Sequence, residues 1–413
     1  MNVGKRKIVW YKPGNILSNY FWFYTITAVL YVIFPNVSLF NLIFPFIIYY
    51  VWIQTKRQIN LNGIDFCWMA CFVWIIITWL SNSFPHKNYL IFRSFLSSIA
   101  FMMAYWIGRK SKFNYLKTII EKARVPIIIS CSIGIYCFLF EPSWYMNIVN
   151  NAVSAGANGE YVDKDLVLDQ YRLRSFFDGP YPIAYFCSIS LIFEFFRIVQ
   201  SSKITYKKEF TYIAFLLVCV ILTMMRAPLA CVAIGLALSA LYALFFSGNG
   251  KFIGLFAGGL IILVGAIYFI KSFVDVSSIQ FLLDKFSDLT EDHNNFISGR
   301  FFLQSKSFTE FGEGFSKYDA VSFYKFGGDS IPDGEYVKII AEQGYVGLFL
   351  TILLFSLGLL KSIINFKRLY LELAIIIMVL VCMIGADPLT IPDKHCFIYW
   401  LALGQISGYN KYK

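Results

Sequence analysis

The sequence FTYIAFLLVCVILTMMRAPLACVAIGLALSALYALFF, residues 210–246, decides the fold of this chain. Arg226 is the one charged residue within it. A single membrane helix needs about 20 apolar residues, so this stretch is long enough for two. We therefore predict two antiparallel membrane helices that meet at Arg226, Ala227 and Pro228. An arginine at such a tip is costly unless an anionic group binds it, so the side of the membrane that it faces bears directly on function.

The composition of the whole chain is that of an integral membrane protein. Of its 413 residues, 58% are hydrophobic, 19% aromatic and 15% charged, and the mean hydropathy is +0.61. Soluble domains usually carry about 25% charged residues. The composition therefore excludes an ordinary soluble protein and favours a chain built mainly of membrane helices.

Twelve apolar runs are separated by polar connections, and the basic segment MNVGKRKIVWYKP precedes the first. The runs are 18–34, 37–54, 64–81, 90–108, 125–141, 181–198, 210–225, 227–246, 252–270, 336–360, 370–386 and 396–410. No small-residue cleavage site follows the first run, so we expect an uncleaved helix rather than a signal peptide. The predicted fold is all-α and polytopic, with about 12 transmembrane helices and a large helical outer loop.

The net charge of +11 could indicate a nucleic-acid partner, but the distribution of the charges between the two sides of the membrane explains it better. If the twelve runs cross alternately from a cytoplasmic start, 22 of the 36 Lys and Arg residues fall on the inner side. On the outer side fall 20 of the 25 Asp and Glu residues. An excess of Lys and Arg marks the cytoplasmic side of a membrane protein. We therefore predict that both termini are cytoplasmic, and no nucleic acid is needed to explain the charge.

The connections divide the chain into three parts. Residues 1–272 hold nine runs and an outer loop at 142–179, residues 273–335 form a large periplasmic loop, and residues 336–413 hold the last three runs. The segment FLLDKFSDL at 281–289 is amphipathic and predicts a short helix within the large loop. We expect any chemistry where these two loops meet the outer ends of the helices.

Cysteine and histidine offer little chemistry. Nearly all nine cysteines lie inside the predicted helices, where they serve as small apolar side chains, and no disulfide framework is implied. The three histidines are His86, His293 and His395, and the polar surroundings of His293 are typical of a surface position. The sequence has no glycine-rich phosphate loop and no metal-ligand spacing of Cys and His. We therefore expect no cofactor.

Arginine is the strongest candidate for binding a substrate. Five arginines are predicted on the outer side: Arg93, Arg172, Arg174, Arg226 and Arg300. Arginine makes planar, bidentate contacts with phosphate and stays charged at any relevant pH. An arginine need not bind phosphate, because its long side chain can also lie along apolar surface and place the charged group in water. This second explanation suits Arg93 best, at the start of its predicted helix. Arg226, at a tip, and Arg300, in a glycine-flanked turn, are better placed to bind phosphate.

Carboxylates occur near the same outer ends. Asp178 precedes a Gly-Pro pair, and Asp333 and Glu335 open the run at 336–360. The position of Asp333 has two equally good explanations, which are capping of a helix N-terminus and a catalytic role. A general base must be a carboxylate or histidine near the arginines, so Asp333 and Asp178 are candidates. Asp163 and Asp165 match the DxD pattern of metal-dependent glycosyltransferases, although such spacing arises easily by chance in an acidic loop.

Three segments together resemble the O-antigen polymerase (Wzy) and O-antigen ligase superfamily. They are LTMMRAPLA at 222–230, SGRFFLQSKSFTEFGEGFSKYD at 298–319 and DGEYVKIIAEQGYVGLF at 333–349. Members of this superfamily have many membrane helices and a large outer loop before the last few of them. The similarity in layout covers nearly the whole chain, and the order of the three segments carries it.

The resemblance implies a reaction at the periplasmic face of the bacterial inner membrane. A glycan on undecaprenyl diphosphate is transferred to an acceptor hydroxyl in the synthesis of O-antigen or a related polysaccharide, and lipid diphosphate leaves. Neither a nucleotide sugar nor a metal is implied. The family arginines that hold diphosphate match Arg226 and Arg300, and Arg172 or Arg174 matches the arginine of the earlier loop. A flippase and a chain-length regulator are the implied partners, besides membrane lipids.

Within this superfamily the residues before the re-entry helix separate two activities. Ligases have a His-Asn pair there, whereas this chain has Asp333 and Gly334, which favours the polymerase. Glu335 and Tyr336 follow directly, and we expect them to contact the sugar, with the tyrosine able to stack on its ring. Tyrosine is also the usual residue of a membrane interface.

A transporter, such as a flippase for lipid-linked oligosaccharides, is the main alternative from another class. Transporters place polar groups and broken helices near the middle of the membrane, often within internal repeats. Here the predicted helices are almost uncharged at their centres, no repeat is found, and the acidic residues collect on one side. This pattern favours an enzyme.

Overall fold

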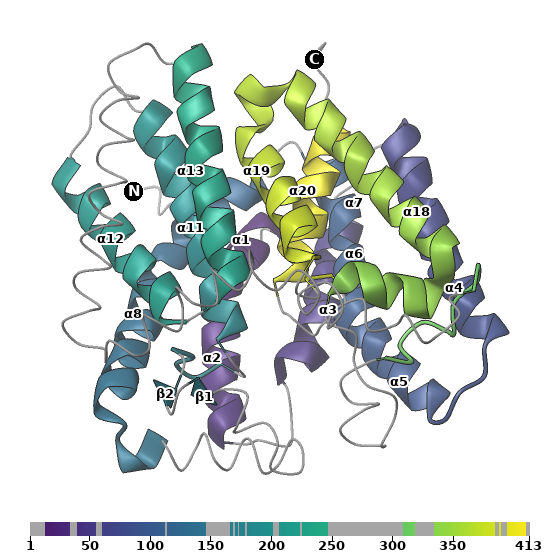
Figure 1. Cartoon of the computed structure of the whole chain (residues 1–413), viewed down its shortest axis with the longest axis horizontal. Helices are drawn as coiled ribbons and strands as arrows, with labels where there is room; N and C mark the ends of the chain where they lie inside the picture. Colours follow the sequence, from purple (N-terminus) through teal and green to yellow (C-terminus); the bar gives the residue numbers. More distant parts are fainter. Residues whose placement is uncertain are drawn as a thin grey trace, which may run out of the picture.

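The computed structural model describes most of the chain as a bundle of helices (Figure 1). The described residues are 13–33, 39–54, 60–111, 114–145, 166–167, 170–171, 173–177, 180–200, 206–223, 225–246, 309–318, 334–384, 388–389 and 395–409. Within them the prediction of an all-α chain is confirmed, apart from one short antiparallel pair of strands. These are β1 (Leu166–Val167) and β2 (Gln170–Tyr171), with Leu166 opposite Tyr171.

The helices keep the labels of Figure 1 throughout. In the first half they are α1 (Pro13–Ser18), α2 (Tyr20–Ile33), α3 (Leu39–Gln54), α4 (Gly63–Ser81), α5 (Lys87–Ser94), the π-helical turn Phe95–Ile99, α6 (Ala100–Met102), α7 (Ala104–Lys110) and α8 (Tyr115–Phe140). In the second half they are α11 (Tyr181–Gln200), α12 (Tyr206–Leu222), α13 (Arg226–Phe246), α18 (Glu335–Ile364), α19 (Phe366–Cys382) and α20 (Cys396–Gly408).

The segment that decides the fold forms the predicted pair of helices. α12 ends at Leu222 and α13 begins at Arg226, so the chain reverses within a few residues. Pro228 is the third residue of α13, where its missing N–H costs no helical hydrogen bond. Of the twelve predicted runs, only 252–270 has no helical counterpart to compare, because it lies outside the described residues.

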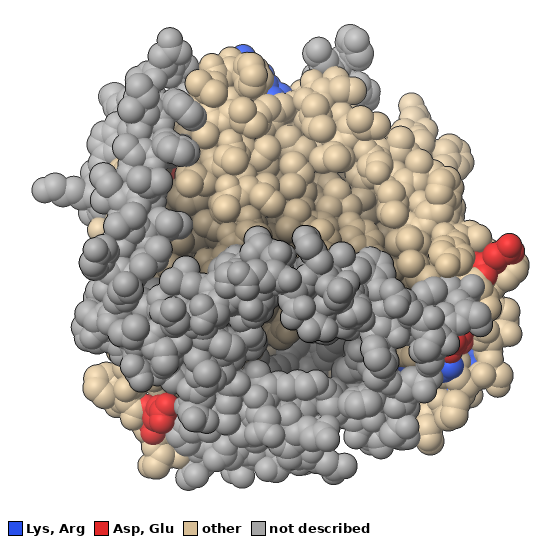
Figure 2. Space-filling view, viewed as in Figure 1, with Lys and Arg blue, Asp and Glu red and all other residues tan. Residues whose placement is uncertain are grey.

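Five of the described helices are long and apolar enough to cross a membrane, namely α4, α8, α11, α13 and α18. Shorter apolar helices occur within α2, α3, α12 and α20. Large apolar side chains point outward, including Phe46, Phe92 and Phe140, which are 65%, 64% and 68% exposed. The described surface in Figure 2 carries very few charged side chains. A surface this apolar suits lipid rather than water.

Helix α11 forms the centre of the bundle. Its residues are buried almost without interruption from Pro182 to Val199, and α8, α12, α13 and α19 pack around it. A helix that is apolar on all sides is stable only when it is surrounded in this way. All nine cysteines lie within the described ranges and are free thiols, and eight of them are buried, in agreement with the predicted role as small apolar side chains.

Glycines bring α7 and α20 into backbone contact. A Cβ atom on Gly404 would lie 2.0 Å from the Tyr105 carbonyl oxygen, and one on Gly108 would lie 2.3 Å from the Leu401 carbonyl oxygen. Gly404 and Gly408 are four residues apart, the spacing at which small residues let membrane helices approach closely. This contact fixes α20 against the first half of the chain.

One predicted run contains an irregular turn, and one predicted helix start was wrong. The run 90–108 is helical throughout and includes a π-helical turn after α5, while Met103 keeps helical dihedral angles. The turn begins beside Ser94, whose hydroxyl bonds to that of Ser316, a distant contact that the local sequence does not reveal. α8 begins ten residues before the predicted run, because the Asn114 side chain accepts a hydrogen bond from the Lys117 amide and caps a polar first turn.

The run 336–360 is also not a single straight helix. α18 is broken at Gly344, whose φ of 69° is not helical. In Figure 1 the residues before the break form an arm that lies across the direction of the longer part, residues 345–364. The arm, residues 335–343, begins beside the connection between α19 and α20, where Glu335 accepts a hydrogen bond from the Leu389 amide. This geometry brings the start of α18 to the site described next.

Candidate functional site

The structure describes only part of the predicted site. Among the candidate residues it describes Arg174, Glu335 and Tyr336, and the backbone of Arg226. Outside the described residues, or described without their side chains, are Arg172, Arg300, Asp178, Asp333 and the guanidinium group of Arg226. The short helix predicted at 281–289 and the DxD residues Asp163 and Asp165 also lie outside. The predicted roles of these residues stay predictions.

The loop that carries Arg174 docks against the end of α12. The Leu173 amide donates a 3.0 Å hydrogen bond to the Leu222 carbonyl, in the last turn of α12. Arg174 is 7% exposed, and its Nε donates to the Phe177 carbonyl at 3.3 Å. Leu222 lies four residues before Arg226, so the two predicted arginine segments meet at one place. Arg174 also stabilises the turn of its own loop.

Contacts with α8 hold this loop in an unusual conformation. Ser175 has a φ of 56°, which is rare for a residue with a side chain. Its hydroxyl donates to the Ser130 carbonyl at 2.7 Å, and its own carbonyl accepts from the Tyr145 hydroxyl at 3.2 Å. A Cβ atom on Gly134 would lie 3.1 Å from that of Ser175, so glycine makes room for the loop. A strained residue with this many partners is typical of a functional site.

The first turn of α13 faces α11 and α19. The Ser188 hydroxyl of α11 lies 3.2 Å from the Pro228 carbonyl oxygen, and the Cys231 sulfur lies 3.3 Å from the Cys382 sulfur at the end of α19. The next residue, Met383, accepts a hydrogen bond from the Tyr336 amide at 3.4 Å. The second turn of α13 and the start of α18 therefore both border the end of α19. A helix N-terminus carries partial positive charge and favours anions.

Glu335 and Tyr336 hold the connection between α19 and α20. Glu335 is fully buried, and its Oε2 accepts a 3.0 Å hydrogen bond from the Leu389 amide. The Tyr336 hydroxyl donates to the Leu380 carbonyl at 3.0 Å. The N-cap of α18 is Gly334, with a φ of 105°, and the predicted cap Asp333 lies outside the described residues. Glu335 and Tyr336 were predicted to bind substrate, and the described hydrogen bonds of their side chains are instead with the backbone of Leu389 and Leu380.

His395, immediately before α20, joins the same region, and sequence reasoning assigned it no role. It is fully buried, and its Nε2 lies 2.9 Å from the Pro182 carbonyl oxygen, at the start of α11. Because a carbonyl only accepts, Nε2 carries a proton. Nδ1 lies 3.1 Å from the Tyr20 hydroxyl. His395 therefore ties α2 and α11 to α20. The one signal in the sequence was a polar residue just before an apolar run.

Aromatic packing connects His395 to the arginine loop. The Phe177 ring stacks on that of Tyr24, with centroids 4.8 Å apart, and Tyr24 meets the His395 ring edge-on at 5.5 Å. Phe186 of α11 also lies against the histidine, at 5.2 Å. The loop at 173–177 and His395 thus belong to one packed unit. Rigid packing of this kind keeps charged groups at fixed positions.

The arrangement suits the binding of an anion. The start of α18 bonds to the end of α19 at Met383, and the loop of the buried Arg174 bonds to the end of α12, just before α13 begins. Oriented backbone amides and guanidinium groups stabilise a developing negative charge best when they are fixed in advance. Within the described ranges no group of three His, Cys, Asp or Glu residues is arranged to hold a metal ion.

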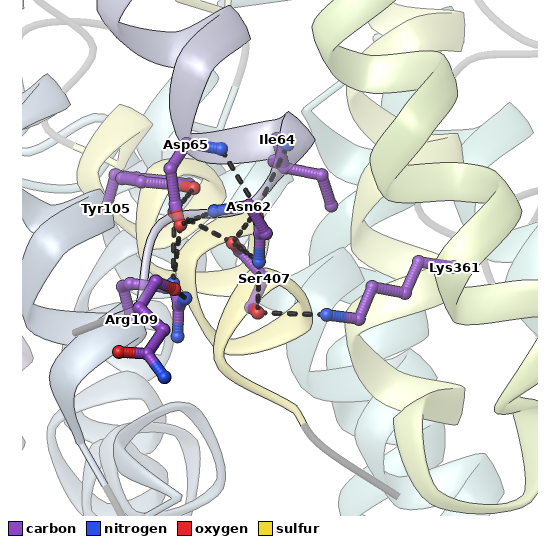
Figure 3. Close-up of polar contacts among 8 residues, drawn as sticks. Asn62, Ile64, Asp65, Tyr105, Arg109, Lys361 and Ser407 are labelled. Carbon is purple, nitrogen blue, oxygen red and sulfur yellow. Dashed lines mark hydrogen bonds and ion pairs between the residues drawn. The ribbon is translucent and has the colours of Figure 1, made fainter.

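A second polar cluster lies at the far end of α20. Figure 3 shows Asp65 at the start of α4, where it accepts hydrogen bonds from Arg109 Nε at 3.0 Å and from the Ser407 hydroxyl at 2.9 Å. Tyr105 donates to the same carboxylate, and Lys361 donates to the Ser407 carbonyl at 2.9 Å. The charge pattern predicts all of these residues near the inner side. Since each group has partners from other helices, this Asp65 cluster is an anchor between helix ends.

Comparison with protein-family models found no match for this chain, and neither did comparison with curated proteins or with solved structures.

Proposed function

We propose that this protein is a glycosyltransferase that polymerises lipid-diphosphate-linked oligosaccharide repeat units at the periplasmic face of the bacterial inner membrane. In this proposal about 12 helices cross the membrane in a GT-C-like arrangement, and both termini are cytoplasmic. The donor is a glycan on undecaprenyl diphosphate, and the product is O-antigen or a related surface polysaccharide. A flippase would supply the repeat units, and a chain-length regulator would limit the product.

One observation carries the proposal. The loop of Arg174 bonds to the last turn of α12 through Leu222, four residues before Arg226 begins α13. Two segments that the sequence marked as arginine-bearing are therefore neighbours, although about fifty residues separate them along the chain. The end of α19 joins the start of α18 to the same place. A convergence of cationic groups is what a diphosphate requires.

The proposed chemistry is a displacement at the anomeric carbon. The acceptor hydroxyl oxygen forms the new glycosidic bond, the bond from the sugar to the diphosphate oxygen breaks, and a carboxylate removes the hydroxyl proton. Negative charge grows on the leaving diphosphate while the sugar becomes positively charged. Fixed guanidinium groups stabilise that leaving charge, which is commonly the largest contribution to such catalysis.

Each predicted residue has a place in this scheme. Arg226 and Arg300 hold the diphosphate, and Arg172 makes a further contact from the loop that Arg174 braces. Asp333 or Asp178 is the general base. Glu335 and Tyr336 shape the wall of the site, because Glu335 contacts the connection between α19 and α20 and the Tyr336 hydroxyl contacts the last turn of α19.

Purified protein in liposomes tests the function. We expect lipid-linked repeat units to lengthen without any nucleotide sugar, and Arg226→Ala to abolish the lengthening. Arg93→Ala is the matched control, since this arginine lies in the last turn of α5 and no role in the site is proposed for it. Movement of unlengthened repeats across the membrane would instead identify a transporter. Transfer of finished glycan to a lipid A acceptor, with no lengthening, would identify a ligase.

A further inference from the structure

The break in α18 is filled by a segment of the large loop. In a regular helix the carbonyls of Ala341 and Glu342 would accept hydrogen bonds from residues four positions later. The non-helical conformation of Gly344 removes those bonds. Instead the Glu313 amide donates to the Ala341 carbonyl at 2.8 Å, and the Gly314 amide donates to the Glu342 carbonyl at 2.9 Å. The loop segment thus supplies the donors that the helix has lost.

Two further backbone groups at the break bond to other parts of the chain. The Val346 amide donates to the Glu310 carbonyl at 3.5 Å, and the Trp74 indole N–H of α4 donates to the Gln343 carbonyl at 2.8 Å. In an apolar setting each unsatisfied backbone group costs several kcal/mol, so a broken helix persists only where other protein groups replace its bonds. The break and the loop segment therefore depend on each other.

Glycine is required at each point of closest approach. Gly312 has a φ of 68°, and a Cβ atom on it would lie 2.5 Å from the Gln343 amide nitrogen. A Cβ atom on Gly344 would lie 2.1 Å from the Glu310 carbonyl oxygen. Gly314 has a φ of 114° and fits against the Phe84 ring. No side chain fits the backbone contacts of Gly312 and Gly344, and the positive φ of Gly314 also favours glycine.

Side chains extend the contact to two further helices. Glu342 is 1% exposed, and its Oε1 accepts a hydrogen bond from the Tyr318 amide at 3.0 Å. The Tyr318 hydroxyl donates to the Glu313 carboxylate at 2.8 Å. Ser316 bonds to Ser94 of α5, and the Phe311 ring stacks on that of Trp74 with centroids 5.6 Å apart. Residues 309–318 are thus held by α4, α5 and both sides of the break.

We propose that residues 309–318 are a latch that positions the arm of α18, residues 335–343, against the connection between α19 and α20. The arm begins with Glu335 and Tyr336, which contact Leu389 and Leu380 at the candidate site. Releasing the latch frees the arm to turn about Gly344 and withdraws those contacts. Residues of the latch are therefore positioning residues. Their effect on catalysis rests on the proposed function, whereas their effect on the arm does not.

Gly312→Ala is the direct test, because it adds a methyl group against backbone and strains a positive φ. Gly63→Ala is the matched control, since a Cβ atom there meets nothing within 4 Å. We expect amide hydrogen exchange in residues 336–343 to become at least about tenfold faster in Gly312→Ala, with residues 350–364 unchanged. In the liposome assay we expect kcat to fall about tenfold or more while KM for the repeat unit changes little.

The two readouts separate failure of the latch from failure of the proposed function. Native exchange rates in the arm of Gly312→Ala would overturn the latch. Faster exchange with a native kcat would overturn its positioning role. If the native protein lengthens no glycan, the proposed function fails, and hydrogen exchange alone still decides whether the latch holds the arm.

A milder variant keeps the test decisive if Gly312→Ala does not fold. Trp74→Phe removes the donor to the Gln343 carbonyl and keeps an aromatic ring beside Phe311. We expect the same changes in the same direction, with exchange in the arm about threefold to tenfold faster. Exchange rates equal to those of the native protein would contradict the latch.

Discussion

Removal of the Asp65 carboxylate tests whether the Asp65 cluster anchors the helix ends. Asp65 is fully buried in the first turn of α4. It accepts hydrogen bonds from Arg109 Nε at 3.0 Å, from the Ser407 hydroxyl at 2.9 Å and from the Asn62 amide at 2.8 Å, and a further bond from Tyr105. These donors come from α7, α20 and the chain before α4. Asp65→Ala removes the acceptor that all of them share.

The contacts allow the loss of stability to be estimated. Removing one partner of a buried ion pair typically costs about 3–5 kcal/mol, because the other charge stays buried without compensation. The Arg109 side chain is only 12% exposed, so water replaces little of the lost carboxylate. Arg109 keeps its 2.6 Å hydrogen bond to the Asn60 carbonyl, which lowers the cost. We therefore expect the free energy of unfolding to fall by about 3 kcal/mol, the lower end of that range.

Reversible unfolding in mixed micelles, driven by increasing SDS, measures this difference. Glu121→Ala is the matched control, since Glu121 and Lys117 form an ion pair of 3.9 Å with both side chains about half exposed. An exposed pair one helical turn apart contributes only about 0.3–0.5 kcal/mol. Equal losses in the two variants, or a loss below about 1 kcal/mol in Asp65→Ala, would refute the anchor.

Two further predictions concern helix packing and the site. Gly404→Ala should lower the free energy of unfolding by about 1–3 kcal/mol, because its methyl group would meet the Tyr105 carbonyl oxygen 2.0 Å away. The same SDS titration measures this loss. A free energy of unfolding equal to that of the native protein would contradict the backbone contact of α7 and α20. Arg300→Ala should abolish long-chain polymer while the protein stays inserted, and Arg300→Lys should restore it only in part, because lysine lacks the bidentate contact. Gel analysis of polymer length measures this, and a native ladder in Arg300→Ala would remove that arginine from the proposed clamp.

Local sequence patterns predicted the helices well where burial in lipid dominates. The hairpin at 210–246 follows from its length and its single charge, and the structure ends α12 and begins α13 around the predicted tip. The same reasoning missed the break at Gly344. The apolar run 336–360 predicts a continuous helix despite its three glycines, and the break becomes stable only through hydrogen bonds with residues 310–314, which lie about thirty positions earlier.

The candidate site was predictable only where local sequence was informative. The arginine-bearing segments were identified from the residue type and its place between apolar runs, and the structure brings the segment of Arg174 to the end of α12. His395 was missed because its role depends on contacts with Tyr20 and Pro182, hundreds of residues away in sequence. A single histidine near a helix start has no local pattern that distinguishes it from a surface residue.

Binding of a soluble lipid-diphosphate analogue to the purified protein tests the central claim most directly. If Arg226 binds the diphosphate, Arg226→Ala should raise the Kd for the analogue about 10- to 100-fold, which is the effect of losing one hydrogen bond to a charged group. Arg93→Ala should bind as the native protein does. Equal Kd values for the native protein and Arg226→Ala would contradict the account.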